Sequence, residues 1–308
     1  MLIQHGGPVG PAEAWTAWNW DPVVWLVVLL PAVAYVALWR RAGRRDLAAR
    51  WRRRSFLAGV AALAVALLSP LDAMGESLAS AHMVQHLLLT TVAAPLLVLG
   101  VRWRVLVGGV PVAVRRRTAT WRTTSVGRTG RAVLAHPVAA GLPFVAALWL
   151  WHAEGPYGAA LDSSFVHAVE HACFLVTALL SWAAILARSR RRSAAPGMAV
   201  LVLFGLAMVS GLLGLLLTFA RTPWYPAYAE TTEAWGLTPL EDQQLAGVIM
   251  WVPGGGAYLI AALALVALWI RTPADPVLTK FHVRSRGQNA HRTREVGTAT
   301  TAEPRAST

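Results

Sequence analysis

The chain has 308 residues, of which 56% are hydrophobic and only 14% are charged. An average soluble domain carries roughly 25% charged residues, and the apolar residues here form long runs without an amphipathic period. These features exclude an ordinary soluble domain and predict an all-α polytopic membrane protein. The net charge of +13 comes from arginines clustered between the apolar runs, where they face anionic lipid, so no nucleic-acid partner is expected.

Seven apolar runs predict a seven-transmembrane-helix bundle, because most approach the ~20 residues that a bilayer requires. The expected spans are residues 22–39, 56–69, 82–100, 133–151, 165–187, 197–219 and 245–270. The second span is short, and we expect it to extend at its inner end through the snorkelling side chains of Arg52 to Arg54.

The distribution of basic residues predicts the orientation. All but one of the 28 Lys and Arg residues, Arg221, lie in four segments that fall on one face of the membrane: 40–54, 101–133, 188–196 and the residues from 271 onward. The positive-inside rule makes this face cytoplasmic, so the N-terminus lies outside and the C-terminus inside. Residues 1–21 contain no Lys or Arg and therefore lack the basic start of a cleavable signal peptide.

Three segments follow from this topology. They are an extracytoplasmic N-terminal segment (1–21), a seven-helix transmembrane domain (22–272) and a basic, disordered cytoplasmic tail (273–308). The long outer loop of residues 220–243 carries Trp224, Tyr225, Tyr228 and Trp235, a mixture typical of an aromatic belt at the membrane interface. This loop is a candidate lid or docking surface.

Histidines gather at the outer ends of the predicted spans. His82 and His86 are four residues apart, as are His167 and His171, so each pair projects from one face of its helix with Cβ atoms roughly 5–6 Å apart. Both helices start at the outer surface, so the pairs lie at similar depth and can face each other. His152, at the outer end of the fourth span, lies on the same side.

Imidazole is a ligand for Cu, Zn, Fe and Ni, and a thioether shifts the preference toward Cu(I). Met74, Met83 and Met250 are the candidate thioethers on this side of the membrane. The pattern predicts a metal or haem role for at least one histidine pair. A single intramembrane histidine also commonly serves as an interhelical hydrogen-bonding group, which is the alternative for each residue taken alone.

Other polar or helix-bending residues near these histidines leave two interpretations open. Glu170 lies between His167 and His171. Its carboxylate either binds the metal or orients a metal-binding imidazole, or it pairs with a group on another helix. Asp242, at the start of the seventh span, has either a capping role or a ligand or gating role. Pro253 and the three glycines after it interrupt that span and either bend it around the outer cavity or allow tight packing.

Three stretches together resemble a known family: His82-Met-Val-Gln-His86 with Ala94-Pro95, His167-Ala-Val-Glu-His171 leading to Trp182, and Asp242-Gln-Gln leading to Met250-Trp-Val-Pro. In this order and at these helix ends they are similar to the CtaG family of cytochrome c oxidase assembly factors, the Bacillus type. The resemblance covers about residues 20 to 272. The matching positions are His82, His86, His167, His171, Asp242, Gln243, Met250 and Trp251.

The resemblance implies a seven-helix protein of the bacterial plasma membrane that helps mature a haem-copper terminal oxidase, with oxidase subunits as partners and copper as the metal it handles. The leading hypothesis is therefore a non-enzymatic assembly factor that binds copper through His82, His86, His167 and His171. The accessory residues are His152, Met83, Glu170, Asp242 and Met250. The alternatives are a haem-carrying electron-transfer protein, since facing histidines supply axial ligands, and a copper transporter.

Overall fold

The computed structural model describes residues 8–41, 47–101, 116, 119–120, 123–189 and 196–271. Over these residues the chain is helical and contains no strand. Five helices are long and apolar enough to cross a membrane, and two bent pairs of helices raise the number of spans to seven if each pair counts as one. The chain is therefore an all-α polytopic membrane protein, as predicted.

The continuous spans are α2 (Pro22–Arg41), the segment made of α5 (Ala79–Leu87), the π-helix η1 (Leu88–Ala93) and α6 (Ala94–Gly100), then α12 (Ser164–Ser189), α13 (Pro196–Thr218) and α14 (Pro239–Ile270). The bent pairs are α3 (Leu47–Leu68) with α4 (Leu71–Ser77), at 43°, and α9 (Ser125–Leu134) with α10 (Pro137–Trp151), at 74°. Short helices complete the described chain: α1 (Pro11–Ala14), α11 (Glu154–Asp162) and the 3₁₀ turns η2 (Pro226–Tyr228) and η3 (Glu233–Trp235).

Two helices extend beyond the predicted spans. α3 begins at Leu47 rather than at residue 56 and so includes the arginines that were expected to lengthen this span. α14 begins at Pro239 rather than at residue 245 and runs through Pro253 as one helix, so the predicted interruption does not break it. A proline removes one backbone hydrogen bond, and packing of the neighbouring helices holds the remaining turns together.

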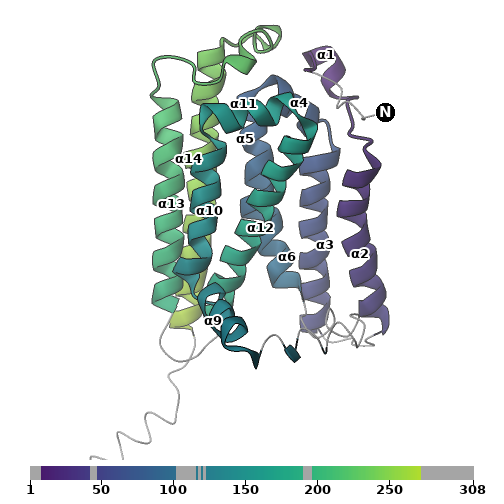
Figure 1. The fold of residues 1–308 in the computed structure, drawn as a ribbon, viewed down its shortest axis with the longest axis vertical. Coiled ribbons are helices and arrows are strands. Elements are labelled where there is room, and N and C mark those ends of the chain that lie inside the picture. Colours follow the sequence, from purple (N-terminus) through teal and green to yellow (C-terminus); the bar gives the residue numbers. More distant parts are fainter. Residues whose placement is uncertain are drawn as a thin grey trace, which may run out of the picture. The chain divides into compact units, whose positions relative to one another are not determined.

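Residues up to Leu265 form one compact unit, and residues from Val266 onward form a second unit, of which 266–271 are described. Within the first unit α10 packs along α12 and α13, while α3 packs against α2 and α6 (Figure 1). The apolar core falls into two clusters, one around Phe174 and Trp182 and the other around Tyr35 and Phe56. The predicted tail, 273–308, lies outside the described residues, and the predicted three-segment division stays a prediction.

Helices α13 and α14 approach each other at glycines. A Cβ atom built on Gly247 would lie 2.6 Å from the carbonyl oxygen of Gly214, so the two backbones are in direct contact. Among the described residues, by contrast, nothing lies within 4 Å of a Cβ atom built on Gly205 or Gly211. The contact at Gly214 and Gly247 fixes the part of α14 that carries Met250.

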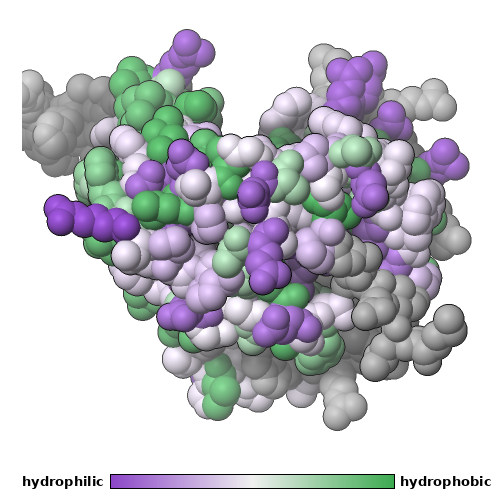
Figure 2. Space-filling model, turned by 90° about the horizontal axis from the view of Figure 1, so that it is seen from above, coloured by the Kyte–Doolittle hydropathy of each residue, from purple (hydrophilic) through white to green (hydrophobic). Residues whose placement is uncertain are grey.

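Helices α4 and α11 cover one end of the first unit, together with α1 and the turns η2 and η3 (Figure 1). We call it the α4–α11 end. Viewed from above, it presents many hydrophilic side chains (Figure 2), as a surface in contact with water does. It corresponds to the side predicted to be extracytoplasmic.

Candidate metal centre

The two predicted histidine pairs meet near the α4–α11 end. The ring centroids of His82 and His86 on α5 lie 4.3 Å apart, and those of His167 and His171 on α12 lie 4.2 Å apart. Across the two helices, His82 lies 5.3 Å from His167 and His86 lies 5.3 Å from His171. All four side chains are buried. The helical spacing of four brings the two histidines of each pair together, and the approach of α5 to α12 brings both pairs into one cluster. The sequence predicted that the pairs could face each other, and the structure shows that they do.

Glu170 on α12 points into this cluster. Its carboxylate oxygens lie 3.5 Å from His82 Nε2 and 3.7 Å from His86 Nε2, and its side chain is fully buried. Both separations exceed the length of an ordinary hydrogen bond between nitrogen and oxygen. The carboxylate thus lies between two imidazoles at the distance of ligands that share an ion, rather than in a closed ion pair.

Polar atoms in the cluster are left without hydrogen bonds. Among the described residues, neither ring nitrogen of His82, neither ring nitrogen of His86 and neither carboxylate oxygen of Glu170 has a hydrogen-bond partner. A buried polar atom without a partner costs about 1–3 kcal/mol, and a buried charge costs more. A metal cation between these groups would satisfy several of them at once, so the residues present fit a metal ion.

Two overlapping sets of side chains have metal-binding geometry. In the first set His82, His86, Glu170 and His171 each offer a ligand atom within 4.8 Å of the others. In the second set Asp72, His167 and His171 do the same. Two ligands of one ion at 2.0–2.2 Å lie at most about 4.4 Å apart, so small side-chain adjustments close either set.

Asp72 was not among the predicted site residues. It lies on α4, where its carboxylate accepts hydrogen bonds from Gln85 Nε2 at 2.7 Å and from Asn19 Nδ2 at 2.8 Å. The sequence placed Asp72 in a short outer loop. Asp72 is only ten residues from His82, and so short a connection keeps the two residues near each other. This separation was the feature of the sequence that could have indicated Asp72 as a site residue.

His152 ends α10 beside the cluster, with its ring centroid 6.1 Å from that of His86. Its Nδ1 atom lies 2.7 Å from the Leu148 carbonyl oxygen, which can only accept a hydrogen bond. His152 Nε2 faces the sulfur of Met83 at 3.3 Å. Burial lowers the pKa of His152, just past the end of the span, to about 4, so the ring is neutral at pH 7.

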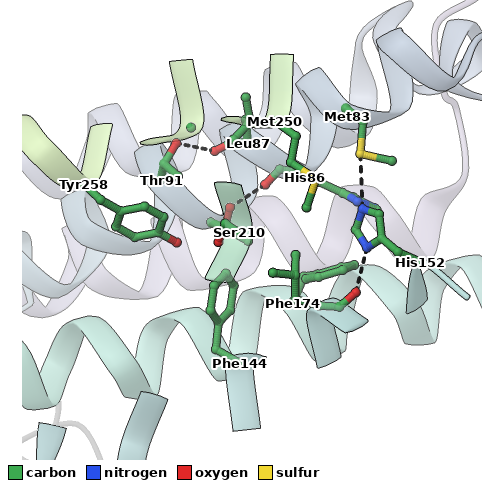
Figure 3. Close-up of a pocket in the computed structure, with 13 residues that line it drawn as sticks. Met83, His86, Leu87, Thr91, Phe144, His152, Phe174, Ser210, Met250 and Tyr258 are labelled. Atoms are coloured by element: carbon green, nitrogen blue, oxygen red, sulfur yellow. Dashed lines mark hydrogen bonds between the residues drawn. The ribbon is translucent and has the colours of Figure 1, made fainter. Parts of the chain in front are cut away.

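Met83, Met250, His86 and His152 line one small cavity of about 30 Å³ (Figure 3). Both methionines are buried, at 2% and 5% exposure. Met250 reaches this cavity from α14, as expected if the seventh span lines the outer cavity. The structure thus separates the predicted accessories Met83, His152 and Met250 from Glu170, which belongs to the imidazole cluster.

The structure places Asp242 outside both metal-binding sets. Its carboxylate accepts hydrogen bonds from the backbone nitrogens of Ala79, at 2.6 Å, and Ser80, at 3.2 Å, and from the Ser80 hydroxyl. Asp242 therefore caps the N-terminus of α5 from α14, and its carboxylate is committed to this role. It positions the helix that carries His82 and His86 and does not reach their imidazoles.

The π-helix η1 lies directly after the His86 turn of α5. Pro95, at the start of α6, has no backbone N–H to donate back into this turn. The Thr90 carbonyl oxygen accepts a hydrogen bond from Trp182 Nε1 of α12 at 2.9 Å instead. This bond ties the helix that carries His86 to the helix that carries His171. Insertions of this type are frequent at functional sites.

Three tyrosines cover the histidine cluster at the α4–α11 end. Tyr157 of α11 stacks on Tyr225 at 3.9 Å between ring centroids, and its hydroxyl lies 3.0 Å from that of Tyr228. The Tyr228 hydroxyl donates to the Gly75 carbonyl, and the Tyr225 hydroxyl donates to the His152 carbonyl. Burial raises the pKa of all three, so they are neutral donors. Tyr225 and Tyr228, two of the aromatic residues of the outer loop, are buried in the protein, whereas Trp224 and Trp235 of the same loop are partly exposed.

Fold and site together define a polytopic helical membrane protein with a buried cluster of histidines and one glutamate near one end of its helices. Residues 33–272 match the model of the family described as cytochrome c oxidase caa3 assembly factor (Caa3_CtaG). The chain belongs to this family, which confirms the resemblance seen in its motifs.

Mycobacterial proteins are similar to most of the chain. Uncharacterized protein Mb0105 of Mycobacterium bovis and uncharacterized protein MT0111 of Mycobacterium tuberculosis are each 27% identical over 276 residues, which is 84% of this chain and 40% of the relative. Uncharacterized protein ML1998 of Mycobacterium leprae is 24% identical over 282 residues, 86% of this chain and 41% of the relative. The chain thus spans about two fifths of the length of these curated relatives. No solved structure matches it.

Proposed function

We propose that this chain is a non-catalytic assembly factor for a haem-copper oxidase, and that it binds a copper ion as cargo at the extracytoplasmic side of the bacterial plasma membrane. The ligands are the imidazoles of His82, His86 and His171 and the carboxylate of Glu170. One observation carries the proposal: Glu170 is fully buried beside two imidazoles, and these three side chains have no hydrogen bonds among the described residues.

The donor set favours copper among the metals that an oxidase contains. Neutral imidazole and carboxylate together bind Cu(II), and the first-row affinity order places Cu(II) highest for nitrogen and oxygen ligands. The family to which the chain belongs is described by its role in cytochrome c oxidase assembly. The described site has no cysteine ligand, since Cys173 is absent from both metal-binding sets. Without thiolates the ion stays exchangeable, as delivery to an oxidase subunit requires.

The geometry supports a bare ion over haem. The cavity that His86 lines has a volume of about 30 Å³. A site for an organic cofactor is typically about 300–1,000 Å³. The rings of His82 and His167 also stack at 5.3 Å with only 21° between their planes, so they are in contact rather than separated by a macrocycle.

The test combines copper content with oxidase maturation. The variants are His82→Ala/His86→Ala and, as a matched control, His136→Ala, whose side chain is exposed at the start of α10. Each is expressed in a bacterial host whose own family member is deleted. Copper per chain is measured after detergent purification, and oxidase activity is measured in the membranes.

We expect the double variant to lose both copper and oxidase maturation, while His136→Ala keeps both. Retention of copper by the double variant would overturn the assignment of the ligands. Loss of copper with normal oxidase maturation would overturn the role of the ion as cargo. Circular dichroism and gel-filtration profiles matching those of the wild type verify that each variant is folded.

A further inference from the structure

His152 Nε2 and the Met83 sulfur are in contact, and in the neutral ring no hydrogen atom lies between them. The Leu148 carbonyl holds the N–H of the neutral ring at Nδ1, so Nε2 presents a lone pair. That lone pair faces the Met83 thioether at 3.3 Å, and a thioether has no hydrogen to donate. The lone pairs of the imidazole nitrogen and the thioether sulfur therefore face each other in the protein interior. At 3.3 Å between the two atoms, no water molecule fits between them.

A soft cation would turn this contact into coordination. One imidazole nitrogen and one thioether sulfur bound to the same ion, at bond lengths near 2.0 and 2.3 Å, lie roughly 3.5 Å apart. The observed 3.3 Å is close to this separation. Imidazole with thioether is a donor pair that favours Cu(I), and it differs from the imidazole and carboxylate donors around Glu170.

Further ligands surround the same space. Met250 and His86 line the cavity together with Met83 and His152 (Figure 3), and its volume of about 30 Å³ has room for a single ion. His86 also belongs to the set around Glu170. The cavity is thus adjacent to the imidazole and carboxylate site and shares one residue with it.

His152 also borders a depression on the other side. This depression has a volume of about 360 Å³ and is lined by His152, Glu154, Trp224 and Pro226, among others. Glu154 is exposed and supplies a carboxylate at its rim. His152 therefore borders both the depression and the cavity with the methionines, and His86 belongs both to that cavity and to the set around Glu170.

We propose that His152 Nε2 and the thioethers of Met83 and Met250 form a second metal position, selective for a soft monovalent ion such as Cu(I), between the surface depression and the site around Glu170. Its role as a transfer step rests on the proposed function, because it needs copper at the Glu170 site. The thioether position itself depends only on its own donors.

Silver ion tests this position, because Ag(I) is a redox-inert probe of Cu(I) sites. Full-length protein in detergent is titrated with Ag(I), and X-ray absorption identifies the atoms bound to silver. The variant Met83→Leu/Met250→Leu removes both sulfurs at nearly constant volume, so the fold is retained. The control Met208→Leu changes a methionine that is 54% exposed on α13.

We expect sulfur neighbours around silver in the wild type and in Met208→Leu. In Met83→Leu/Met250→Leu the sulfur neighbours should be absent and the silver affinity lower by at least about tenfold. Silver bound only to nitrogen and oxygen in the wild type, or equal affinity in the double variant and the control, would overturn the proposal.

A second variant separates this proposal from the first. His82→Ala/Glu170→Gln removes ligands of the imidazole and carboxylate site and leaves all three thioether-site ligands in place. We expect it to retain silver with sulfur neighbours while it loses Cu(II). Retention of Cu(II) with normal silver binding would contradict the proposed function and leave the thioether position standing, whereas loss of the sulfur neighbours would contradict the thioether position.

Discussion

The contact between α3 and α6 and the cluster between α5 and α12 both lie inside the first unit. They differ in whether their buried polar groups form hydrogen bonds within the protein. At the first contact the Ser55 hydroxyl donates to the Leu96 carbonyl at 2.8 Å. From the neighbouring helix α2, the Tyr35 hydroxyl donates to the Gly100 carbonyl of α6 at 2.6 Å. The backbone of Gly100 lies directly against Phe56. The polar groups at this contact are therefore satisfied within the protein.

At the second interface the side chains do not satisfy one another. Glu170 lies 3.5 Å or more from both imidazoles that it faces, and the described atoms around it supply no hydrogen bond. Such a cluster lowers the stability of the helices that carry it unless a cation binds. The comparison separates residues that hold the helices together from residues of the proposed metal site. Substitutions at the two interfaces should therefore have different effects.

The largest effect is expected for Glu170→Gln. This change removes the carboxylate from the set of His82, His86, Glu170 and His171, so copper affinity should fall about 10- to 100-fold or more. Stability of the metal-free protein should stay equal or rise, because a buried charge is removed. Competition with a chelator measures the first quantity, and thermal unfolding in detergent measures the second. The control is Glu230→Gln, at an exposed residue. Unchanged copper affinity in Glu170→Gln would show that the carboxylate is not a ligand.

Gly100→Ala should give the opposite pattern. A Cβ atom at this position would lie 2.6 Å from the Phe56 Cα atom, so α3 and α6 must separate. We expect a loss of about 1–3 kcal/mol in stability with copper affinity unchanged. Gly205→Ala is the control, because nothing lies within 4 Å of its Cβ position. A melting temperature equal to that of the control would refute the close packing of α3 and α6.

Asp242→Ala tests a residue that both stabilises a helix and positions the helix that carries His82 and His86. It removes the acceptor for two backbone nitrogens at the start of α5, which should cost about 0.5–2 kcal/mol of stability. A smaller loss of copper affinity should follow, because α5 carries His82 and His86. Asp242→Asn keeps an acceptor oxygen and should recover most of the stability. If alanine and asparagine behaved alike in thermal unfolding, the capping role would be wrong.

The smallest effect is expected for Tyr157→Phe. It removes one hydrogen bond, to Tyr228, and leaves the stacking on Tyr225 in place. The cost should be about 0.5–1.5 kcal/mol, measured by thermal unfolding. Copper should also exchange faster with an external chelator, because the cover over the cluster is looser. Slower exchange than in the wild type would contradict the placement of Tyr157 in this cover.

The length of the apolar runs was sufficient to predict most of the spans, and the spacing of four residues predicted the two histidine pairs. The 74° bend between α9 and α10, which falls inside the expected span 133–151, was not predicted. A spacing of four residues fixes the face of a helix, and the shared starting surface fixes the depth, so the sequence predicts that the two histidine pairs can face each other. That the two helices are neighbours follows only from the structure. Glu170 followed because it lies one turn from His167 on the same helix.

The missed features depend on partners that are distant in the chain. Asp242 caps a helix 163 residues away, and the capping considered from the sequence was that of its own helix. Tyr228 donates to the Gly75 carbonyl, 153 residues away, so this side chain of the aromatic loop is buried in the protein. No local pattern contains these tertiary contacts.

Electron paramagnetic resonance of the Cu(II)-loaded protein tests the central claim most directly, because it reports the atoms bound to copper. The samples are the wild type, His82→Ala/His86→Ala and His136→Ala, each loaded with one equivalent of Cu(II) in detergent. We expect nitrogen hyperfine couplings from several imidazoles in the wild type and in His136→Ala, and their loss in the double variant. The same nitrogen couplings in all three samples, or the spectrum of free aqueous copper in the wild type, would contradict a copper site at His82, His86, His171 and Glu170.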